Sequence, residues 1–456
     1  MDSREINQTF RKGLPMVESR DPEALKEEIG HLEAINSRPH FWQRWQGYLK
    51  FSGPGWLQSA VTLGAGSAGA SIFAGAVYGY KLLWVQPVAI MIGLIMFLAI
   101  GHQLIITRAR PYDVFWKKLH PGLAIFWGIN VLLASTVWQF PQYSLGTAVL
   151  QDIFSVLGVQ IATWPFALFM LIVVTAVCWS YGKGSRKAVT GFERSLKYML
   201  LVMVGAFLLV VIKTGIDWEK AMDGLFGFYM PTDLKGIIIV LGMIGAAVGV
   251  NQTFLYPYTM LARGWGKSHR KLKNFDLSTS MVIPFVLATG FVVIACANTL
   301  YVKGIDVKGP VDAAHALEPI VGLTFGRIIF SIGVLSMCLT TAVIEMLICG
   351  FVLSEMFNFE YHGTKYKVST MVANIGVLGA FYHMPLWLPV LTSSFNLIML
   401  PIAYICFFIL QNDKSYLGTE VNKGLKGTVW NSLMILAIII VSIGAVLKLL
   451  SMFDLL

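Results

Sequence analysis

Charged residues are scarce in this chain of 456 residues: Asp, Glu, Lys and Arg make up 13%, whereas hydrophobic residues make up 56%. The mean hydropathy is +0.67. Soluble globular domains carry about 25% charged residues, so this composition excludes an ordinary soluble protein. Apolar runs of about 20 residues recur along the chain, and each is long enough to cross a bilayer as a helix. We therefore expect an all-α integral membrane protein.

Further absences narrow the function. The five cysteines lie inside apolar runs without CxxC spacing, which argues against a disulfide framework or a zinc site. The sequence has no phosphate-binding P-loop, no nucleophile–base pair and no cluster of metal ligands, so we expect neither an enzyme nor a cofactor. The first 50 residues lack the apolar core of a secretory signal. The net charge of +10 comes from basic residues in short loops between apolar runs, so we expect no nucleic-acid partner.

The apolar runs predict about eleven transmembrane helices, after a short surface helix at 21–34. Their ranges are 53–77, 82–106, 122–148, 163–182, 192–213, 235–262, 278–301, 323–357, 367–382, 385–411 and 428–450. Most of the 35 Lys and Arg residues fall in the N-terminal segment and in every second connection. Because such residues collect on the cytoplasmic side, we expect a multi-pass protein of the cell membrane with its N-terminus inside and its C-terminus outside.

Two of these spans are interrupted halfway. Residues 63–69 of the first span read LGAGSAG, and glycine and serine at this density weaken a helix. The sixth span contains Gly242, Gly245 and Gly249, followed by the polar residues 251–253. Unwound backbone at membrane depth is tolerated only around a cavity or inside the protein, and transporters use it to bind substrate. We therefore predict two broken helices that form one substrate site.

The two interrupted spans each begin a block of five, which is typical of an inverted five-plus-five repeat with alternating access. The expected organisation is a cytoplasmic segment, a first repeat, a second repeat and an additional C-terminal helix. Their boundaries are 1–52, 53–213, 235–411 and 428–450.

Several stretches resemble the NRAMP family of divalent metal transporters, which have the LeuT-type fold. The resemblance is carried by Gly53-Pro54-Gly55-Trp56-Leu57, by 74–85 (AGAVYGYKLLWV), by 245–248 (GAAV), by 274–276 (NFD) and by 400–403 (LPIA). It covers most of residues 53–411 and implies a LeuT-type fold with broken first and sixth helices.

The chain departs from that family at the metal site. The resemblance places the family's metal-binding Asp and Asn on Gly64 and Ser67. Its Met-Pro-His falls on Gly249-Val250-Asn251. Two acids of its proton route fall near Phe140 and Tyr143, and a glutamine that assists the metal falls near Asn396. The resemblance therefore indicates a divergent branch in which proton coupling is doubtful.

The groups left at the aligned positions are hydroxyls, amides and backbone carbonyls. The expected substrate-binding residues are Thr62, Gly64, Gly66, Ser67, Ala247, Gly249, Asn251, Gln252, Thr253 and Asn396, of which Ser67, Asn251 and Asn396 are candidate metal ligands. Neutral oxygens in a roomy site suit a hard cation that keeps part of its hydration shell, such as Mg²⁺, better than Mn²⁺ or Fe²⁺.

Two alternatives stay open at this point. A helix break with exposed N–H groups also suits the carboxylate of an amino acid or another small organic solute. A sensor that does not transport is the other alternative. Glu345 is an acid well inside a predicted span and is a candidate coupling residue. Gln139, Gln142 and Tyr143 of the third span are candidates for lining the cavity.

Overall fold

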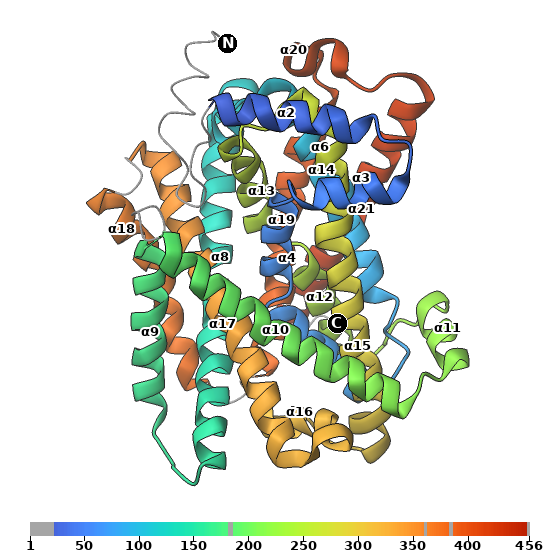
Figure 1. Ribbon diagram of the computed structural model, residues 1–456, viewed down its shortest axis with the longest axis vertical. Coiled ribbons are helices and arrows are strands. Elements are labelled where there is room, and N and C mark those ends of the chain that lie inside the picture. The colour runs from blue at the N-terminus through green and yellow to red at the C-terminus, as the bar shows by residue number, and fades with distance from the viewer. Residues whose placement is uncertain (1–21, 181–185, 360–362, 383–385, 454–456) are drawn as a thin grey trace.

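The computed structural model describes residues 22–180, 186–359, 363–382 and 386–453, and within them the fold is built from helices that run mostly along one long axis (Figure 1). The helices before the second break are α2 (Pro22–Asn36), α3 (Phe41–Leu49), α4 (Pro54–Thr62), α5 (Ala65–Tyr78), α6 (Val85–Thr107), α7 (Pro111–Val114), η1 (Phe115–Leu119), α8 (Pro121–Val156), α9 (Thr163–Ser180), α10 (Arg186–Thr214), α11 (Trp218–Phe226) and α12 (Leu234–Ala247).

The remaining elements follow the second break. They are α13 (Val250–Ala262), η2 (Lys267–His269), α14 (Arg270–Asp276), η3 (Leu277–Val282), α15 (Ile283–Cys296), η4 (Ala297–Tyr301), α16 (Pro310–Ala314), η5 (His315–Leu317), α17 (Glu318–Phe357), α18 (Thr364–Thr370), η6 (Met371–Phe381), α19 (Trp387–Asn412), α20 (Lys414–Leu417), η7 (Gly418–Glu420) and α21 (Gly424–Met452). The predicted all-α architecture is confirmed.

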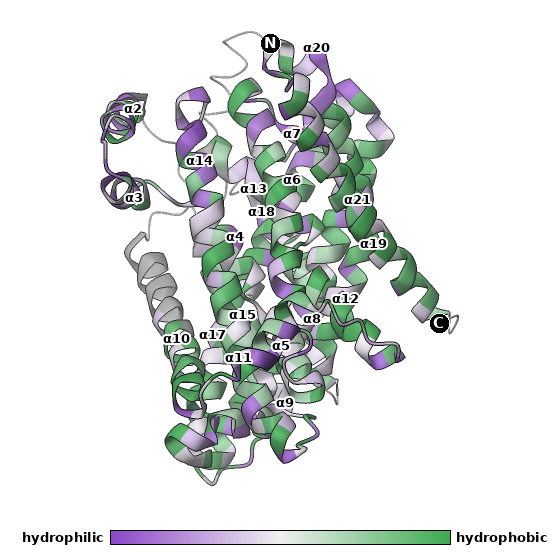
Figure 2. Ribbon diagram, turned by 90° about the vertical axis from the view of Figure 1, so that its right-hand side faces the viewer, coloured by the Kyte–Doolittle hydropathy of each residue, from purple (hydrophilic) through white to green (hydrophobic). Residues whose placement is uncertain are grey.

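Eight helices of the described chain are long and apolar enough to cross a membrane, and the bent pair α4–α5 forms a ninth span. These nine coincide with nine of the eleven predicted spans. Apolar colours dominate the middle of the bundle in Figure 2, and hydrophilic colours gather at α2, α3 and the start of α14. The central spans are mostly covered by other helices, whereas α9 and α21 leave most of their apolar surface exposed for lipid.

The other two predicted spans differ from a regular long α-helix. The segment 192–213 falls in α10, whose apolar part is the short stretch Leu201–Thr214. The segment 367–382 is the end of α18 followed by η6, which is a 3₁₀ helix of 11 residues. A 3₁₀ helix rises about 2.0 Å per residue, whereas an α-helix rises about 1.5 Å. The residues of η6 therefore cover a greater length than the same number of residues would in an α-helix. Gly376 and Gly379 let η6 lie directly against Gln139 and Phe140 of α8.

The region before the first span is more ordered than the sequence predicts. The expected surface helix at 21–34 is present as α2, but the aromatic residues after it form a second helix, α3. α2 and α3 lie at the same end of the molecule as α14 and α20, whereas α11 and α16 lie toward the opposite end (Figure 1). We refer to these as the α2–α3 end and the α16 end.

Candidate functional site

The first break lies where the glycine pattern predicts it. α4 ends at Thr62 and α5 begins at Ala65, and the two helices are bent by 51°. Between them Leu63 has φ −85° and ψ 49°, and Gly64 is extended with φ −98° and ψ −171°. The first N–H groups of α5 and the carbonyls that follow Ser59 in α4 therefore have no backbone partners within their own helices, whereas the Ser59 carbonyl accepts the N–H of Leu63 at 2.9 Å. Both sets are available to a ligand.

The second break separates α12 from α13. Val248 and Gly249 are both extended, with φ −144° and −111°. Any residue adopts these angles, so glycine is needed here for space. The Oδ1 atom of Asn251 occupies the place that a Cβ on Gly249 would take. That same oxygen accepts the N–H of Gln252 at 2.9 Å, so Asn251 helps to start α13.

Asn251 also connects the second break to α17. Its Nδ2 donates to Oε1 of Glu345 at 2.7 Å, and both side chains are fully buried. The other carboxylate oxygen, Oε2, has no hydrogen-bond partner among the described residues. A buried acid inside a membrane is costly unless it is paired or in contact with water or an ion. This free oxygen marks the neighbourhood of Asn251 as a place where a ligand or water belongs.

The start of α5 is surrounded by polar side chains from three other helices. A Cβ on Gly64 would lie 2.9 Å from Oγ1 of Thr341 in α17. A Cβ on Gly66 would lie 2.5 Å from Oγ of Ser393 in α19 and 3.3 Å from the indole ring of Trp138 in α8. Because Gly64 and Gly66 have no Cβ atoms, these helices can approach the backbone of the break, whose N–H and C=O groups lack intrahelical partners. Four elements therefore meet at Gly64–Gly66.

Many polar atoms on α8, α13, α17 and α19, the helices that form or adjoin the two breaks, are buried and lack a hydrogen-bond partner within the described ranges. They are Nε1 of Trp138, Oε1 of Gln142, both amide atoms of Gln252, Oγ1 of Thr341, Oγ of Ser393 and both amide atoms of Asn396. Buried polar groups almost always have a partner, which is the protein, ordered water or a ligand. This group, which we call the central polar cluster, has the composition of a site for a polar or hydrated ligand.

The chemistry of the central polar cluster differs from that of a soft-metal site. No group of three or more His, Cys, Asp or Glu side chains able to hold a metal is found in the part of the chain that the structure describes. Oxygen acceptors and N–H donors are mixed, with Glu345 as the nearby acid. Such a set can contact the water shell of a hard cation, whose waters both donate and accept hydrogen bonds.

Several predicted residues have their side chains bonded within their own helices. The hydroxyl of Thr62 donates to the carbonyl of Ser59 at 3.0 Å, and that of Ser67 donates to the carbonyl of Gly64 at 3.1 Å. Thr253 donates to the carbonyl of Val250 at 2.6 Å and accepts from Trp127 at 3.1 Å. Each oxygen retains acceptor capacity, and Ala247 lies at the last position of α12, next to the break.

The three predicted lining residues of α8 point in different directions. Gln142 donates to the carbonyl of Trp138 in its own helix at 3.1 Å, which leaves its Oε1 in the central polar cluster. Gln139 donates to the carbonyl of Ala342 in α17 at 3.3 Å. Tyr143 donates to Asn374 of η6 at 3.3 Å. Tyr143 therefore bonds to η6 rather than to the broken helices.

Sequence reasoning missed Thr341 and Ser393. Threonine in a membrane helix commonly bonds back to its own helix, as Thr340 does to Ser336 at 2.7 Å. Thr341 has no such bond among the described residues. The available signal was its spacing from Glu345, because residues four apart share one face of a helix. A Ser393–Asn396 pair, three apart on α19, gives the same signal.

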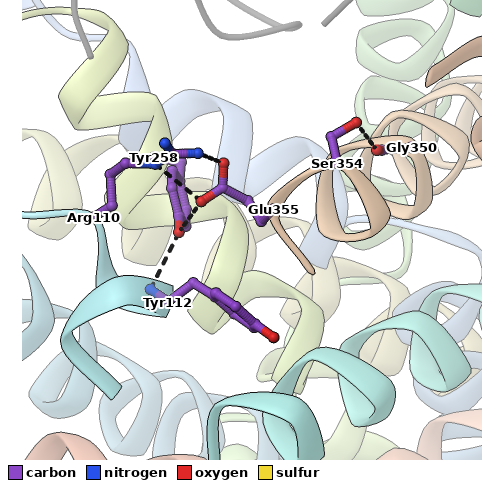
Figure 3. A network of polar contacts seen from close by, with 6 residues as sticks. All are labelled: Arg110, Tyr112, Tyr258, Gly350, Ser354 and Glu355. Carbon is purple, nitrogen blue, oxygen red and sulfur yellow. Dashed lines mark hydrogen bonds and ion pairs between the residues drawn. The ribbon is translucent and has the colours of Figure 1, made fainter. Parts of the chain in front are cut away.

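Polar contacts join helices toward both ends of the molecule. At the α2–α3 end, Glu355 of α17 forms an ion pair with Arg110 and accepts the hydroxyl of Tyr258 at 2.9 Å, as Figure 3 shows. The N–H of Tyr112 in turn donates to the Tyr258 oxygen at 3.2 Å (Figure 3). At the α16 end, Tyr78 of α5 donates to Asp233, which caps α12.

Two broken helices around a buried polar cluster define the class of LeuT-fold membrane transporters, and solved structures agree. A manganese transporter of Eremococcus coleocola superposes with a TM-score of 0.71 at 15% identity, covering 91% of this chain and 90% of that one. MhsT in complex with L-phenylalanine superposes with a TM-score of 0.59 at 16% identity, covering 86% and 98%. The predicted LeuT-type fold is confirmed.

The family follows from the sequence. The family model described as "Natural resistance-associated macrophage protein-like" matches residues 55–451. The chain belongs to this family, Nramp, as the resemblance predicted. Among its relatives is the divalent metal cation transporter MntH of Mycobacterium leprae, 22% identical over 386 residues, or 81% of this chain and 85% of the relative. MntH of Bacillus subtilis is 26% identical over 324 residues, or 67% and 72%. Membership agrees with the prediction that the chain is a multi-pass membrane protein and not an enzyme.

Proposed function

We propose that this protein is a secondary transporter that carries a hard divalent cation, Mg²⁺-like and partly hydrated, across the membrane. The observation that carries the proposal is the central polar cluster between two broken helices in a chain of the Nramp family. The relatives named above are divalent metal cation transporters. A divalent cation is therefore the substrate that the family relatives indicate, and the side chains of this chain's own site determine which divalent cation it prefers.

The preference for a hydrated cation follows from the ligands. The residues aligned with the family's Asp and Met are Gly64 and Gly249, so the first contacts available are backbone carbonyls and the side-chain oxygens of Ser67, Asn251 and Asn396. Mg²⁺ gives up its water reluctantly and is commonly bound through several waters. Gln252, Thr341 and Ser393 offer the outer hydrogen bonds that such waters need. Mn²⁺ and Fe²⁺ gain affinity from imidazole, thiolate or thioether groups, and no such ligand occupies the aligned positions.

Glu345 supplies the negative charge in this proposal. Its Oε2 atom is free to attract the cation or a water of its shell, while Oε1 is held by Asn251. The proposal contains no proton route through the third span, because Phe140 and Tyr143 align with the family's acids and Tyr143 bonds to Asn374.

The proposed organisation is the inverted repeat predicted from the sequence, with repeats at 53–213 and 235–411, after a cytoplasmic segment at 1–52 and before an additional helix at 428–450. The bend between α4 and α5 and the extended residues between α12 and α13 support corresponding roles for the two blocks. Basic loops at 107–121, 263–277 and 412–427 lie with α2 and α3 at one end (Figure 1). This clustering supports a cytoplasmic N-terminus and an outer C-terminus.

A second candidate substrate is a small organic solute with a carboxylate, such as an amino acid. Two observations favour it. The central polar cluster contains N–H donors from Trp138, Gln252 and Asn396. The N–H groups at the start of α5 have no partners within their own helix. Donors and a helix N-terminus both attract anions. A free carboxylate would, however, approach Glu345, and like charges in a buried site repel. We therefore rank the divalent cation first.

Uptake into proteoliposomes separates these candidates. Purified protein would be assayed with Mg²⁺ and Mn²⁺ and, in parallel, with radiolabelled amino acids and small carboxylates. The proposal predicts saturable cation uptake and no saturable uptake of the organic solutes. A matched control is Leu436→Ala, which changes a lipid-exposed residue of α21. Solute uptake without cation uptake would favour the second candidate. Cation binding without any flux would favour a sensor.

A further inference from the structure

Residues 38–50 carry an unusual surface. α3 has the sequence FWQRWQGYL and follows Arg38 and His40, and Lys50 comes directly after it. No Asp or Glu occurs between residues 38 and 53. The match to the Nramp family model begins at residue 55, so α3 lies before the stretch that this model covers.

α3 presents three different faces, because its residues repeat at about 3.6 per turn. One face packs on the protein through Tyr48, whose ring lies 5.2 Å from Phe275 of α14, and through Gly47, which sits against Ile35 of α2. A second face is polar and exposed. It consists of Gln43, Gln46 and Lys50.

The third face is apolar and open. Trp42 is 70% exposed, Phe41 is 58% exposed and Leu49 is 40% exposed. The half-buried Trp45 completes the stripe and holds it in place, because its ring stacks edge-on against Phe275 at 5.1 Å. A contiguous exposed apolar stripe marks a site of contact with a partner or a membrane, and Trp and Tyr gather at the boundary between lipid and water.

The position of α3 identifies what covers this face. α3 ends at Leu49 and the first membrane helix, α4, begins at Pro54. Its neighbour α14 is the start of the span Lys267–Tyr301. In Figures 1 and 2 alike, α3 lies nearer than α2 to the middle of the molecule along its long axis. α3 is therefore at the edge of the apolar band, and α2, with its exposed Glu23, Glu27 and Glu33, lies farther out.

We propose that α3 is an interfacial anchor that inserts Phe41, Trp42 and Leu49 among the lipids of one leaflet, with Arg38 and Lys50 contacting anionic headgroups. The aromatic stripe provides the buried area and the basic, acid-free flanks provide the charge complementarity, which are the two properties of helices that lie in a membrane interface. Just beyond α3, Arg263 at the end of α13 donates to the carbonyl of Phe51 at 3.3 Å, so the link between α3 and α4 is held against the protein.

A fluorophore on α3 in the full-length protein tests the anchor. The five native cysteines are all buried, so a single exposed cysteine can be labelled selectively. The test variant is Phe41→Cys and the matched control is Gln43→Cys on the polar face of the same helix. Both are labelled with a nitrobenzoxadiazole group and placed in vesicles of phosphatidylglycerol and phosphatidylcholine with or without a headgroup-proximal doxyl lipid.

We expect the doxyl lipid to quench the label at position 41 at least twofold more than the label at position 43, and aqueous iodide to show the reverse order. Equal iodide quenching at both positions would overturn the proposal. Shielding of position 41 from iodide without doxyl quenching would also overturn it, because a protein would then cover the face. Adding Arg38→Gln and Lys50→Gln is expected to reduce doxyl quenching more in vesicles rich in phosphatidylglycerol than in pure phosphatidylcholine. An equal effect in both would refute the role of anionic headgroups.

Discussion

At the scale of single residues, Glu345 is the side chain on which the proposed chemistry depends most. It lies in the middle of α17 with one oxygen bonded to Asn251 and the other free among the described residues. Coulomb attraction between a carboxylate and a divalent cation is strong in a buried site, where water screens it poorly. The neutral oxygens around it can orient a hydrated ion but attract it only weakly.

We predict that Glu345→Gln lowers the initial rate of Mg²⁺ uptake by about tenfold or more, which corresponds to about 1.4 kcal/mol. Glutamine has the same shape and can still accept the Asn251 N–H, so the fold is expected to survive. The control is Ser354→Ala in the same helix, whose hydroxyl bonds only to its own helix at Gly350 (Figure 3). Uptake that Glu345→Gln leaves unchanged would remove the carboxylate from the proposal.

The missing aspartate at position 64 gives a second prediction. Gly64→Asp alone is expected to impair the protein, because its Cβ would lie 2.9 Å from Oγ1 of Thr341. The pair Gly64→Asp with Thr341→Ala removes that oxygen and places a carboxylate at the break. We expect the pair to raise the ratio of Mn²⁺ to Mg²⁺ uptake by about tenfold, because an anionic first ligand favours a less hydrated ion. A ratio equal to that of Thr341→Ala would contradict this account.

The candidate site shows which residues a single sequence reveals. Asn251, Gln252 and Asn396 stood out because polar residues are rare in apolar spans. Thr341 did not, because the same residue type at position 340 bonds to its own helix. The direction of a side chain depends on which helix packs against it. Sequence alone placed Tyr143 beside the site, whereas packing of η6 on α8 turns it to Asn374.

At the scale of elements, the contact between α7, α13 and α17 holds the α2–α3 end closed. Tyr258 of α13 is central, since its hydroxyl donates to Glu355 and accepts from the N–H of Tyr112. Tyr258→Phe leaves the Tyr112 N–H without that acceptor. We expect a loss of stability of about 1–3 kcal/mol, measured as thermal unfolding in detergent. Ser354→Ala, the matched control, is expected to cost less. Equal losses would contradict a closing role.

The contact at the α16 end depends on pH. The Tyr78 hydroxyl and, to a smaller extent, the Gly236 N–H hold the pKa of Asp233 below its usual value of 3.8. A carboxyl whose pKa is lowered by folding stabilises the protein above that usual value, and the contribution disappears as the pH falls through the lowered pKa. Asp233→Asn is therefore expected to lower the unfolding temperature at pH 7 and to have a smaller effect near pH 3, where the contribution of the carboxylate is already decreasing. An effect that is the same at both pH values would refute this assignment.

The broken helices were predictable because glycine weakens a helix whatever other helices pack against it. The 3₁₀ form of η6 was not, because its apolar sequence suits either helix and the close approach of Gly376 and Gly379 to α8 decides between them. α3 was missed for a related reason. Its nine residues are too short to form a stable helix alone, and contacts with α2 and α14 supply the stability.

At the scale of the whole molecule, one polar contact joins helices toward each end, Tyr258–Glu355 toward the α2–α3 end and Tyr78–Asp233 toward the α16 end. In the alternating access that we predict from the sequence, we expect Tyr258–Glu355 and Tyr78–Asp233 to open in turn. The two contacts join different pairs of elements, so each can open while the other holds. The interfacial anchor on α3 would steady the entrance to α4 during this motion.

The most direct test of the central claim compares Mg²⁺ and Mn²⁺ uptake by the wild-type protein in one batch of proteoliposomes. The account predicts saturable Mg²⁺ uptake at least as fast as that of Mn²⁺, with no block of Mg²⁺ uptake by a tenfold lower concentration of Mn²⁺. The water shell of the ion, rather than an anionic or sulfur ligand at the positions of Gly64 and Gly249, would then explain the selection of Mg²⁺ over Mn²⁺. Preferred Mn²⁺ uptake, or block of Mg²⁺ uptake by trace Mn²⁺, would contradict the account.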